Sequence, residues 1–211
     1  MKIYNKLLHF DTYLFIFWLC ITFTISCTTI DPNYTASSCI IFEEKKFWYK
    51  DAKKSYDKWN VPISLQLAII KQESSFEQFA KPKRKRLLGI IPWKRPSTAF
   101  GYAQVIDPTW DWYKTKTGNN NASRANFHDI TDFIGWYISQ SNKMIGINKD
   151  DAYNQYLAYH EGQQGFLDKT YEKKEWLKKA ANNVKNNSEI YNSQLKSCEK
   201  ELNKKGLFGF L

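Results

Sequence analysis

The sequence predicts a mainly helical protein with a single domain, and three observations support this fold class. Apolar residues recur at helical spacing along most of the chain, with almost no strand-like alternation. The 211 residues, 43% of them hydrophobic, are enough for one well-packed core and few for two. Prolines and glycines separate the helical segments, and no internal repeat is visible.

The first two predicted helices follow one another closely. An amphipathic helix is expected over residues 48–59, with lysines on the face that points away from the core. Pro62 fits the first turn of the next helix. Residues 65–70 of that helix leave little polar surface, so we expect it to be largely buried. The core-facing residues of the first helix are Trp48, Ala52, Ser55 and Trp59.

Further helix boundaries follow from capping residues. Asp107 and Pro108 are typical of the N-cap and first position of a short helix that ends at Gly118. The next helix ends before Gly146, and Asn148 is expected to cap the one after it. The C-terminal third is expected to hold two more helices. The apolar face of the helix before Gly146 carries Phe127, Ile130, Phe133, Ile134, Tyr137 and Ile138.

The N-terminal residues have the features of a secretory signal. Two lysines precede an apolar stretch that ends at a small residue before Cys27. The sequence Thr24-Ile25-Ser26-Cys27 resembles a bacterial lipobox, which predicts cleavage and lipidation at Cys27. The alternatives are an ordinary signal with an incidental cysteine and an uncleaved anchor, although a membrane-spanning helix needs about twenty apolar residues.

These features define the expected organisation and location. We expect a protein exported and anchored by lipid, with no nucleic-acid partner. Thr28 lacks the aspartate that often retains such lipoproteins at the inner membrane, which favours the periplasmic face of the outer membrane. The predicted segments are a signal peptide at 1–26, a tether at 27–38, the domain at 39–203 and a C-terminal tail at 204–211.

Two cysteines are left once the signal and the lipidation site are set aside. In an exported protein, Cys39 and Cys198 are expected to form a disulfide that joins the two ends of the domain. Such a bridge stabilises by roughly 3–5 kcal/mol on a chain-entropy argument. The alternative makes Cys39 a nucleophile paired with a histidine. The buried stripe of the last helix is expected to carry Tyr191, Leu195, Cys198 and Leu202.

Charge and motifs exclude several classes of function. The net charge of +10 predicts adhesion to polyanions, but an export signal argues against nucleic acid. His160-Glu161 begins like a zinc-protease motif, yet Gln164 stands where the second histidine belongs. No nucleophile elbow or phosphate-binding glycine loop occurs. We therefore expect no metal, no cofactor and a monomeric protein.

Glu73 is the candidate for acid–base chemistry. It ends the apolar helix, and a carboxylate is expensive to place in so apolar a setting. Such surroundings raise a carboxyl pKa, as a general acid at neutral pH requires. The alternative is that Glu73 emerges at the helix end to face water or to meet a lysine.

Three sequence motifs, the first of which contains Glu73, support this role. The first motif is Ile69-Ile70-Lys71-Gln72-Glu73-Ser74-Ser75-Phe76, the second is Gly101-Tyr102-Ala103-Gln104, and the third is Ala158-Tyr159-His160-Glu161-Gly162. In this order they resemble the signature motifs of the soluble lytic transglycosylase family, over roughly residues 45–180. The resemblance implies a lysozyme-like fold and peptidoglycan glycan strands as the substrate.

Carried over position by position, the resemblance also assigns roles. Glu73 is the acid/base, Ser74 supports its placement, and Tyr159 stands across from it. His160 replaces the asparagine usual in the family, which puts the hydrogen bond of that position in doubt. The residues expected to bind substrate are Ser74, Gly101, Tyr102, Gln104, Tyr159, His160 and Glu161.

The number of carboxyls distinguishes two reactions. Glycoside hydrolysis ordinarily uses two carboxyls, and only one is obvious here. The resemblance implies that Glu73 protonates the bond between MurNAc and GlcNAc and then takes a proton from the sugar's C6 hydroxyl, which leaves a 1,6-anhydro end. If Glu77 or Glu161 supplies a second carboxylate, lysozyme-type hydrolysis is the alternative. A noncatalytic wall-binding lipoprotein is another.

The segment between the first and second motifs is unusually basic. Residues 80–97 contain three prolines and seven Lys/Arg around an apolar centre, which predicts an ordered loop or insertion that lengthens the gap between the first and second motifs. Its cations meet stem-peptide carboxylates, anionic lipid headgroups or only solvent.

Among the aromatic residues near the motifs, Tyr102 and Tyr159 are the better candidates for the cleft, while Trp110 and Trp112 fit the core or the cleft equally. Phe76 and Phe79 are also candidates for the cleft.

Overall fold

Helix α4 (Ile63–Ser74), which carries Glu73, is largely buried. The computed structural model describes residues 34–84, 86–87 and 90–208. Every residue from Ile63 to Ile70 is buried, which confirms the expectation for this helix. A fully buried Leu or Ile side chain contributes about 1.5–3 kcal/mol. This packing fixes the position at which Glu73, in the last turn, leaves the core.

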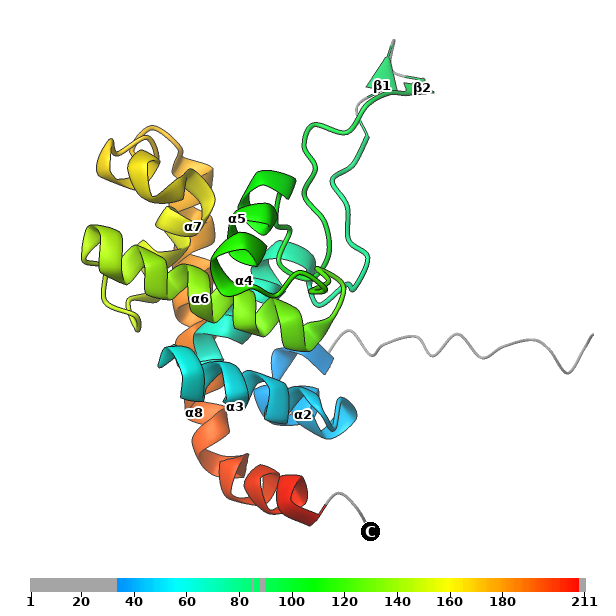
Figure 1. The fold of residues 1–211 in the computed structure, drawn as a ribbon, viewed down its shortest axis with the longest axis vertical. Coiled ribbons are helices and arrows are strands. Elements are labelled where there is room, and N and C mark those ends of the chain that lie inside the picture. The colour runs from blue at the N-terminus through cyan, green and yellow to red at the C-terminus, as the bar shows by residue number, and fades with distance from the viewer. Residues whose placement is uncertain (1–33, 85, 88–89, 209–211) are drawn as a thin grey trace, which may run out of the picture. The chain divides into compact units, whose positions relative to one another are not determined.

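Helices account for most of the described chain, which confirms the predicted mainly helical class. The long helix α8 (Glu175–Phe208) packs along α4 and also contacts α7 (Ala152–Leu167) and α2 (Ser38–Glu44) (Figure 1). Helix α3 (Trp48–Trp59) packs on α6 (Phe127–Ile145). The remaining elements are η1 (Tyr34–Ala36), β1 (Arg86–Leu87), β2 (Ile91–Pro92) and α5 (Asp107–Thr117).

The predicted C-terminal ends of two helices are confirmed. Helix α5 ends at Gly118 and α6 ends at Gly146, and both glycines adopt the left-handed conformation that closes a helix. Pro62 lies one position earlier than expected, because it precedes α4 as the N-cap residue with an extended ψ of 134°.

Two predicted N-caps are wrong. Asp107 is already the first residue of α5, after Ile106, and its carboxylate pairs with Arg124 at 2.7 Å instead of capping the helix. Helix α7 is capped by Asp151, whose side chain accepts from the backbone N–H of Asn154. Asp151 directly precedes the first helical residue and its charge complements the helix dipole, which explains why it caps in place of Asn148.

The described structure extends into both predicted flanking segments. Tyr34 and Ser38 are buried, so ordered structure begins within the predicted tether at 27–38. Helix α8 continues to Phe208, which overlaps the predicted tail at 204–211. Residues 80–97 form a loop as expected, except that β1 and β2 pair antiparallel within it, with Leu87 opposite Ile91.

A disulfide joins Cys39 of α2 to Cys198 of α8, whose Cα atoms lie 6.1 Å apart. It closes a loop of 159 residues. Cys198 packs against the core between Leu195 and Leu202, on the stripe where the periodicity places it.

The described residues from Tyr34 to Phe208 belong to one compact unit that contains its own core. The buried apolar residues run from Tyr34 to Leu202, and the disulfide ties the first long segment of this unit to the last. The predicted signal, Cys27 and Thr28 lie outside the described residues. In the described part of the chain, no helix combines the length and apolar character that a membrane crossing requires.

Candidate active site

The end of α4 presents Glu73 at a groove. Ser75 and Phe76 both have positive φ angles, 51° and 66°, so the chain leaves the helix in a tight turn directly after the first motif's glutamate and serine. Positive φ is uncommon at residues other than glycine and persists where surrounding contacts hold it. Ser74 provides such a contact, because its hydroxyl donates to the carbonyl of Tyr102 at 2.7 Å.

The groove has a volume of about 580 Å³ and draws on all three motifs. Glu73 comes from the first motif, Gln104 from the second, and Tyr159 from the third. Helices α5 and α6 complete one wall, and the base of the 80–97 loop forms another through Pro82 and Ser97. The structure therefore brings together segments that are far apart in the sequence.

The carboxyl of Glu73 has a neutral neighbour and no ion pair among the described residues. Tyr156 donates to its Oε1 at 2.9 Å. Burial raises the pKa of Glu73 to about 7, although the hydrogen bond from Tyr156 lowers it. The lysine of the same motif, Lys71, instead donates to Asn187 of α8. A pKa near 7 leaves Glu73 able to give and to take a proton at neutral pH.

Two side-chain hydrogen bonds join the motifs to one another, and a third joins Tyr156 to the first motif. Ser74 of the first motif binds the second at the carbonyl of Tyr102, and Tyr156, just before the third motif, binds Glu73. Tyr159 of the third motif donates to the carbonyl of Ala103 at 2.7 Å. The second motif is thus held from both sides, which fixes the groove around the carboxyl.

The second motif forms a tight backbone turn, from which Gln104 lines the groove. The amide of Gln104 donates to the carbonyls of Ala80 and Gly101, both at 2.9 Å, so it braces the turn while facing the groove. Gly101 has φ of +78°, and a Cβ there would lie 2.1 Å from the carbonyl oxygen of Arg124. Only glycine fits this close approach.

The side chain of Tyr102 was expected in the cleft but lies elsewhere. The residue is only 6% exposed, and its ring packs edge-on against Trp48 and Phe127 and does not line the groove that holds Glu73. Tyr102 contributes its carbonyl group instead. Its side chain belongs to the core.

The third motif ends at a kink in α7. Gly162, with φ of +76°, breaks the helix and lines the groove together with His160 and Glu161. Burial raises the pKa of Glu161, but hydrogen bonds from Lys174, Thr170 and His160 lower it to about 2. Lys174 contacts both carboxylate oxygens, at 2.8 and 2.7 Å. Glu161 is therefore an ionised, anchored group.

The other aromatic residues considered for the cleft lie in the core or on the surface. Trp110 is buried against Tyr113 and Phe133, and Trp112 packs edge-on against Trp136, so both belong to the core. Phe76 is also buried, while Phe79 is 62% exposed and does not line the groove.

Sequence reasoning missed two tyrosines of the site. Tyr156 is buried and does not line the groove, but its phenol donates to Glu73. It precedes Tyr159 by one helical turn, so the two share a face of α7, and this spacing was a signal for it. Tyr137 reaches the groove from α6, where its periodicity indicated only a core residue. Among the described residues, no group of three or more metal-ligating side chains is found.

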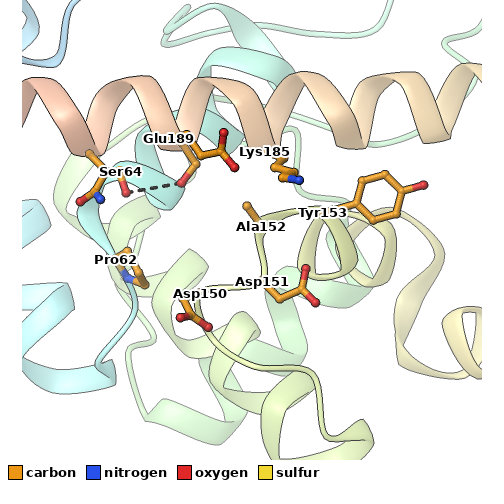
Figure 2. A pocket seen from close by; sticks show the side chains of 10 residues that line it. Pro62, Ser64, Asp150, Asp151, Ala152, Tyr153, Lys185 and Glu189 are labelled. Carbon is orange, nitrogen blue, oxygen red and sulfur yellow. Dashed lines mark hydrogen bonds between the residues drawn. The ribbon is translucent and has the colours of Figure 1, made fainter.

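A second cavity of about 240 Å³ lies on another part of the surface. Figure 2 shows Lys185 and Glu189 of α8 facing Asp150 and Asp151, which directly precede α7. No residue of the three motifs lines this cavity, and its charged groups include both signs. The groove at Glu73 is thus the site to which the motifs point.

A helical domain with a titratable glutamic acid at a tyrosine-lined groove has the features of a glycan-cleaving enzyme. The comparison with protein families agrees: the model of the family described as "Transglycosylase SLT domain" matches residues 15–198. The chain belongs to the transglycosylase SLT domain family, whose lysozyme-like domain acts on peptidoglycan. No curated protein and no solved structure matches the chain.

Proposed function

We propose that the chain cleaves the β-1,4 bond between MurNAc and GlcNAc of peptidoglycan as a lytic transglycosylase, with Glu73 as its single acid/base. The observation that carries this proposal is the Glu73 carboxyl itself, which faces the groove without a basic partner among the described residues and has its pKa raised to about 7 by burial. A catalytic group works best when its pKa lies near the operating pH.

The proposed reaction uses this one carboxyl twice. Protonated Glu73 donates its proton to the glycosidic oxygen, and the bond from that oxygen to C1 of MurNAc breaks. The resulting carboxylate takes the proton of the C6 hydroxyl, whose oxygen forms a new bond to C1. No water is consumed, and the product ends in 1,6-anhydro-MurNAc. Because the nucleophile belongs to the substrate, its proximity replaces a positioned water.

Glu161 supports a second candidate function, lysozyme-type hydrolysis. It lines the same groove in ionised form, and a carboxylate facing a protonated carboxyl is the arrangement that hydrolysis ordinarily uses. Against this, both Glu161 oxygens are engaged by Lys174 and the side chain is only 4% exposed. Glu77 is a weaker candidate, because α4 ends at Ser74 and Glu77 does not line the groove.

Digestion of purified sacculi tests these alternatives. The unit of residues 33–211 and its Glu73→Gln variant are incubated with sacculi, and the released muropeptides are identified by mass spectrometry. Anhydro ends from the wild type alone support the proposal. Reducing ends that disappear in Glu161→Gln indicate hydrolysis, and no release by either protein indicates a noncatalytic binder.

Glu77→Gln is the matched control for this experiment. It makes the same chemical change at an exposed position in the turn after α4. We expect it to release anhydro products at the wild-type rate. An equal loss in Glu77→Gln and Glu73→Gln contradicts a special role for Glu73.

The proposed location is the periplasmic face of the outer membrane, with the protein anchored through lipid on Cys27. The lipobox-like sequence before Cys27 supports this. Labelling cells with a radioactive fatty acid tests it, because Cys27→Ser should remove the label from the protein. Retention of the label in that variant rules out Cys27 as the lipidation site.

A further inference from the structure

The loop between the first and second motifs carries most of the protein's excess charge. Residues 81–96 contain seven Lys/Arg, and no Asp or Glu occurs from Gln78 to Ile106. We call the part of this segment that the structure describes, residues 81–84, 86–87 and 90–96, the basic hairpin. The whole chain has a net charge of +10, so this short segment accounts for the greater part of it. Such a concentration of one sign attracts anionic partners.

The described cations of the basic hairpin are exposed and have no carboxylate partner. Lys81, Lys83, Arg84, Lys94 and Arg95 are all exposed, and none takes part in the ion pairs formed among the described residues. Their mutual repulsion is therefore not relieved within the described part of the chain, and an anionic surface would relieve it.

Large apolar side chains stand beside these cations. Ile90, in the turn between β1 and β2, is 80% exposed, and Trp93, directly after β2, is 50% exposed. Water is a poor environment for both, and a soluble anionic polymer would leave them uncovered. Exposed Ile and Trp flanked by Lys and Arg are typical of segments that lie in the boundary between lipid headgroups and acyl chains.

We propose that the basic hairpin docks this domain on a bilayer that contains anionic phospholipid. Its lysines and arginines contact headgroup phosphates, while Ile90 and Trp93 enter the interface. Pro82 of the basic hairpin and Ser97, directly after it, line the groove of Glu73. Docking thus holds the groove beside the membrane surface, independently of any lipid on Cys27.

Vesicle sedimentation tests this proposal with the compact unit of residues 33–211, which lacks Cys27. We expect binding to phosphatidylcholine vesicles that contain about 30 mol% phosphatidylglycerol and none to pure phosphatidylcholine. The triple variant Lys83→Gln, Lys94→Gln and Arg84→Gln should bind at least roughly 10-fold more weakly, since each cation near an anionic surface contributes to attraction. Raising salt from about 0.1 M to about 0.5 M should weaken wild-type binding.

The matched control makes the same change in net charge elsewhere. Lys116, Lys143 and Lys196 are exposed and form none of the ion pairs among the described residues. Their triple Gln variant should bind within about twofold of the wild type, because distant charges are screened. Equal losses in the two triple variants, or equal binding to neutral and anionic vesicles, overturn the proposal.

A second measurement tests the apolar contact. Lipids brominated near the headgroup should quench wild-type tryptophan fluorescence more than that of Trp93→Phe, and Ile90→Ser with Trp93→Ser should lower the partition at unchanged charge. No difference in quenching overturns the proposed insertion. Weakened binding of the hairpin variant to sacculi, with vesicle binding intact, assigns the cations to wall carboxylates instead. Glu73→Gln should bind vesicles like the wild type, so the outcome does not depend on the proposed reaction.

Discussion

The phenol of Tyr156 donates a hydrogen bond of 2.9 Å to Oε1 of Glu73. Burial raises the pKa of this carboxyl and the hydrogen bond lowers it, with a resulting value of about 7. Burial and the neighbouring Glu73 raise the pKa of Tyr156 itself, so the phenol stays protonated and remains a donor. Tyr156 therefore helps to set the pH below which Glu73 holds a proton to give.

Removal of this donor should move the pH dependence of the reaction. In Tyr156→Phe the carboxylate loses a hydrogen bond, so the pKa of Glu73 should rise by roughly one unit, which corresponds to about 1.4 kcal/mol. A general acid is active while protonated. The alkaline limb of kcat/KM should therefore shift upward from near pH 7. Rates of sacculus solubilisation across pH measure this shift.

Tyr153→Phe is the control for that variant. Tyr153 lies on the same helix but lines the second cavity instead of the groove. Its profile should coincide with that of the wild type. If Tyr156→Phe also leaves the alkaline limb in place, the hydrogen bond does not control Glu73.

The raised pKa of Glu73 also predicts an effect on stability. Its ordinary value is 4.5 and its value in the fold is about 7, so the folded state binds more protons between these pH values. The contribution of Glu73 to the free energy of unfolding is therefore fully present below about pH 4.5 and is lost as pH rises through about 7. Gln cannot ionise, and its carbonyl still accepts from Tyr156. Glu73→Gln should match the wild type near pH 4 and exceed it by roughly 2–3 kcal/mol near pH 8.

Urea unfolding at these two pH values measures the difference in unfolding free energy between Glu73→Gln and the wild type. The contributions of the other titrating groups are the same in both proteins and cancel. Glu77→Gln, at an exposed position, should change stability by less than about 0.5 kcal/mol at either pH. A Glu73→Gln difference that is the same at both pH values means that the carboxyl ionises normally in the fold.

The helices could be predicted because their signals are local. Apolar spacing defined α6, and glycines marked the ends of α5 and α6. The errors arose where several local signals compete. Asp107 and Asn148 both have capping side chains, and only tertiary contacts, such as the pair of Asp107 with Arg124, decide what they do. The strands β1 and β2 escaped prediction because each has only two residues.

The site was only partly predictable for a related reason. The motifs indicated Glu73 and the segments around it, but not which side chains face the groove. Tyr102 lies within a motif and its ring is in the core, whereas Tyr156 lies outside the motifs and contacts the carboxyl. The orientation of Tyr102 depends on tertiary packing around the second motif, which residue spacing does not specify. The spacing of Tyr156 and Tyr159 indicated a shared face of α7, but not that Tyr156 contacts Glu73.

The turn of the second motif should be highly sensitive to a single methyl group. In Gly101→Ala the Cβ would lie 2.1 Å from the carbonyl oxygen of Arg124, at a φ of +78°. Gly118 has a similar φ of +73°, but a Cβ there meets nothing within 4 Å. Gly118→Ala should therefore cost about 1 kcal/mol from backbone conformation alone. Gly101→Ala should cost at least about 2 kcal/mol more, because backbone must move.

Thermal unfolding of both variants, followed by circular dichroism, measures this difference. Gly101→Ala should also lose activity at temperatures where it remains folded, since the turn carries Gln104 and receives the hydrogen bonds of Ser74 and Tyr159. Equal melting temperatures for the two variants contradict the close approach at Gly101.

The disulfide between Cys39 and Cys198 should stabilise the fold without shaping the groove. It closes a loop of 159 residues and joins α2 to α8, neither of which lines the groove of Glu73. Replacement of both cysteines by serine frees the unfolded chain and should lower the free energy of unfolding by roughly 3–5 kcal/mol. Activity at low temperature should be retained. Urea unfolding with and without reductant measures the effect: reductant should lower the wild-type midpoint and leave the double variant unchanged. A wild-type midpoint that is indifferent to reductant, with both thiols free in peptide mapping, contradicts the bridge.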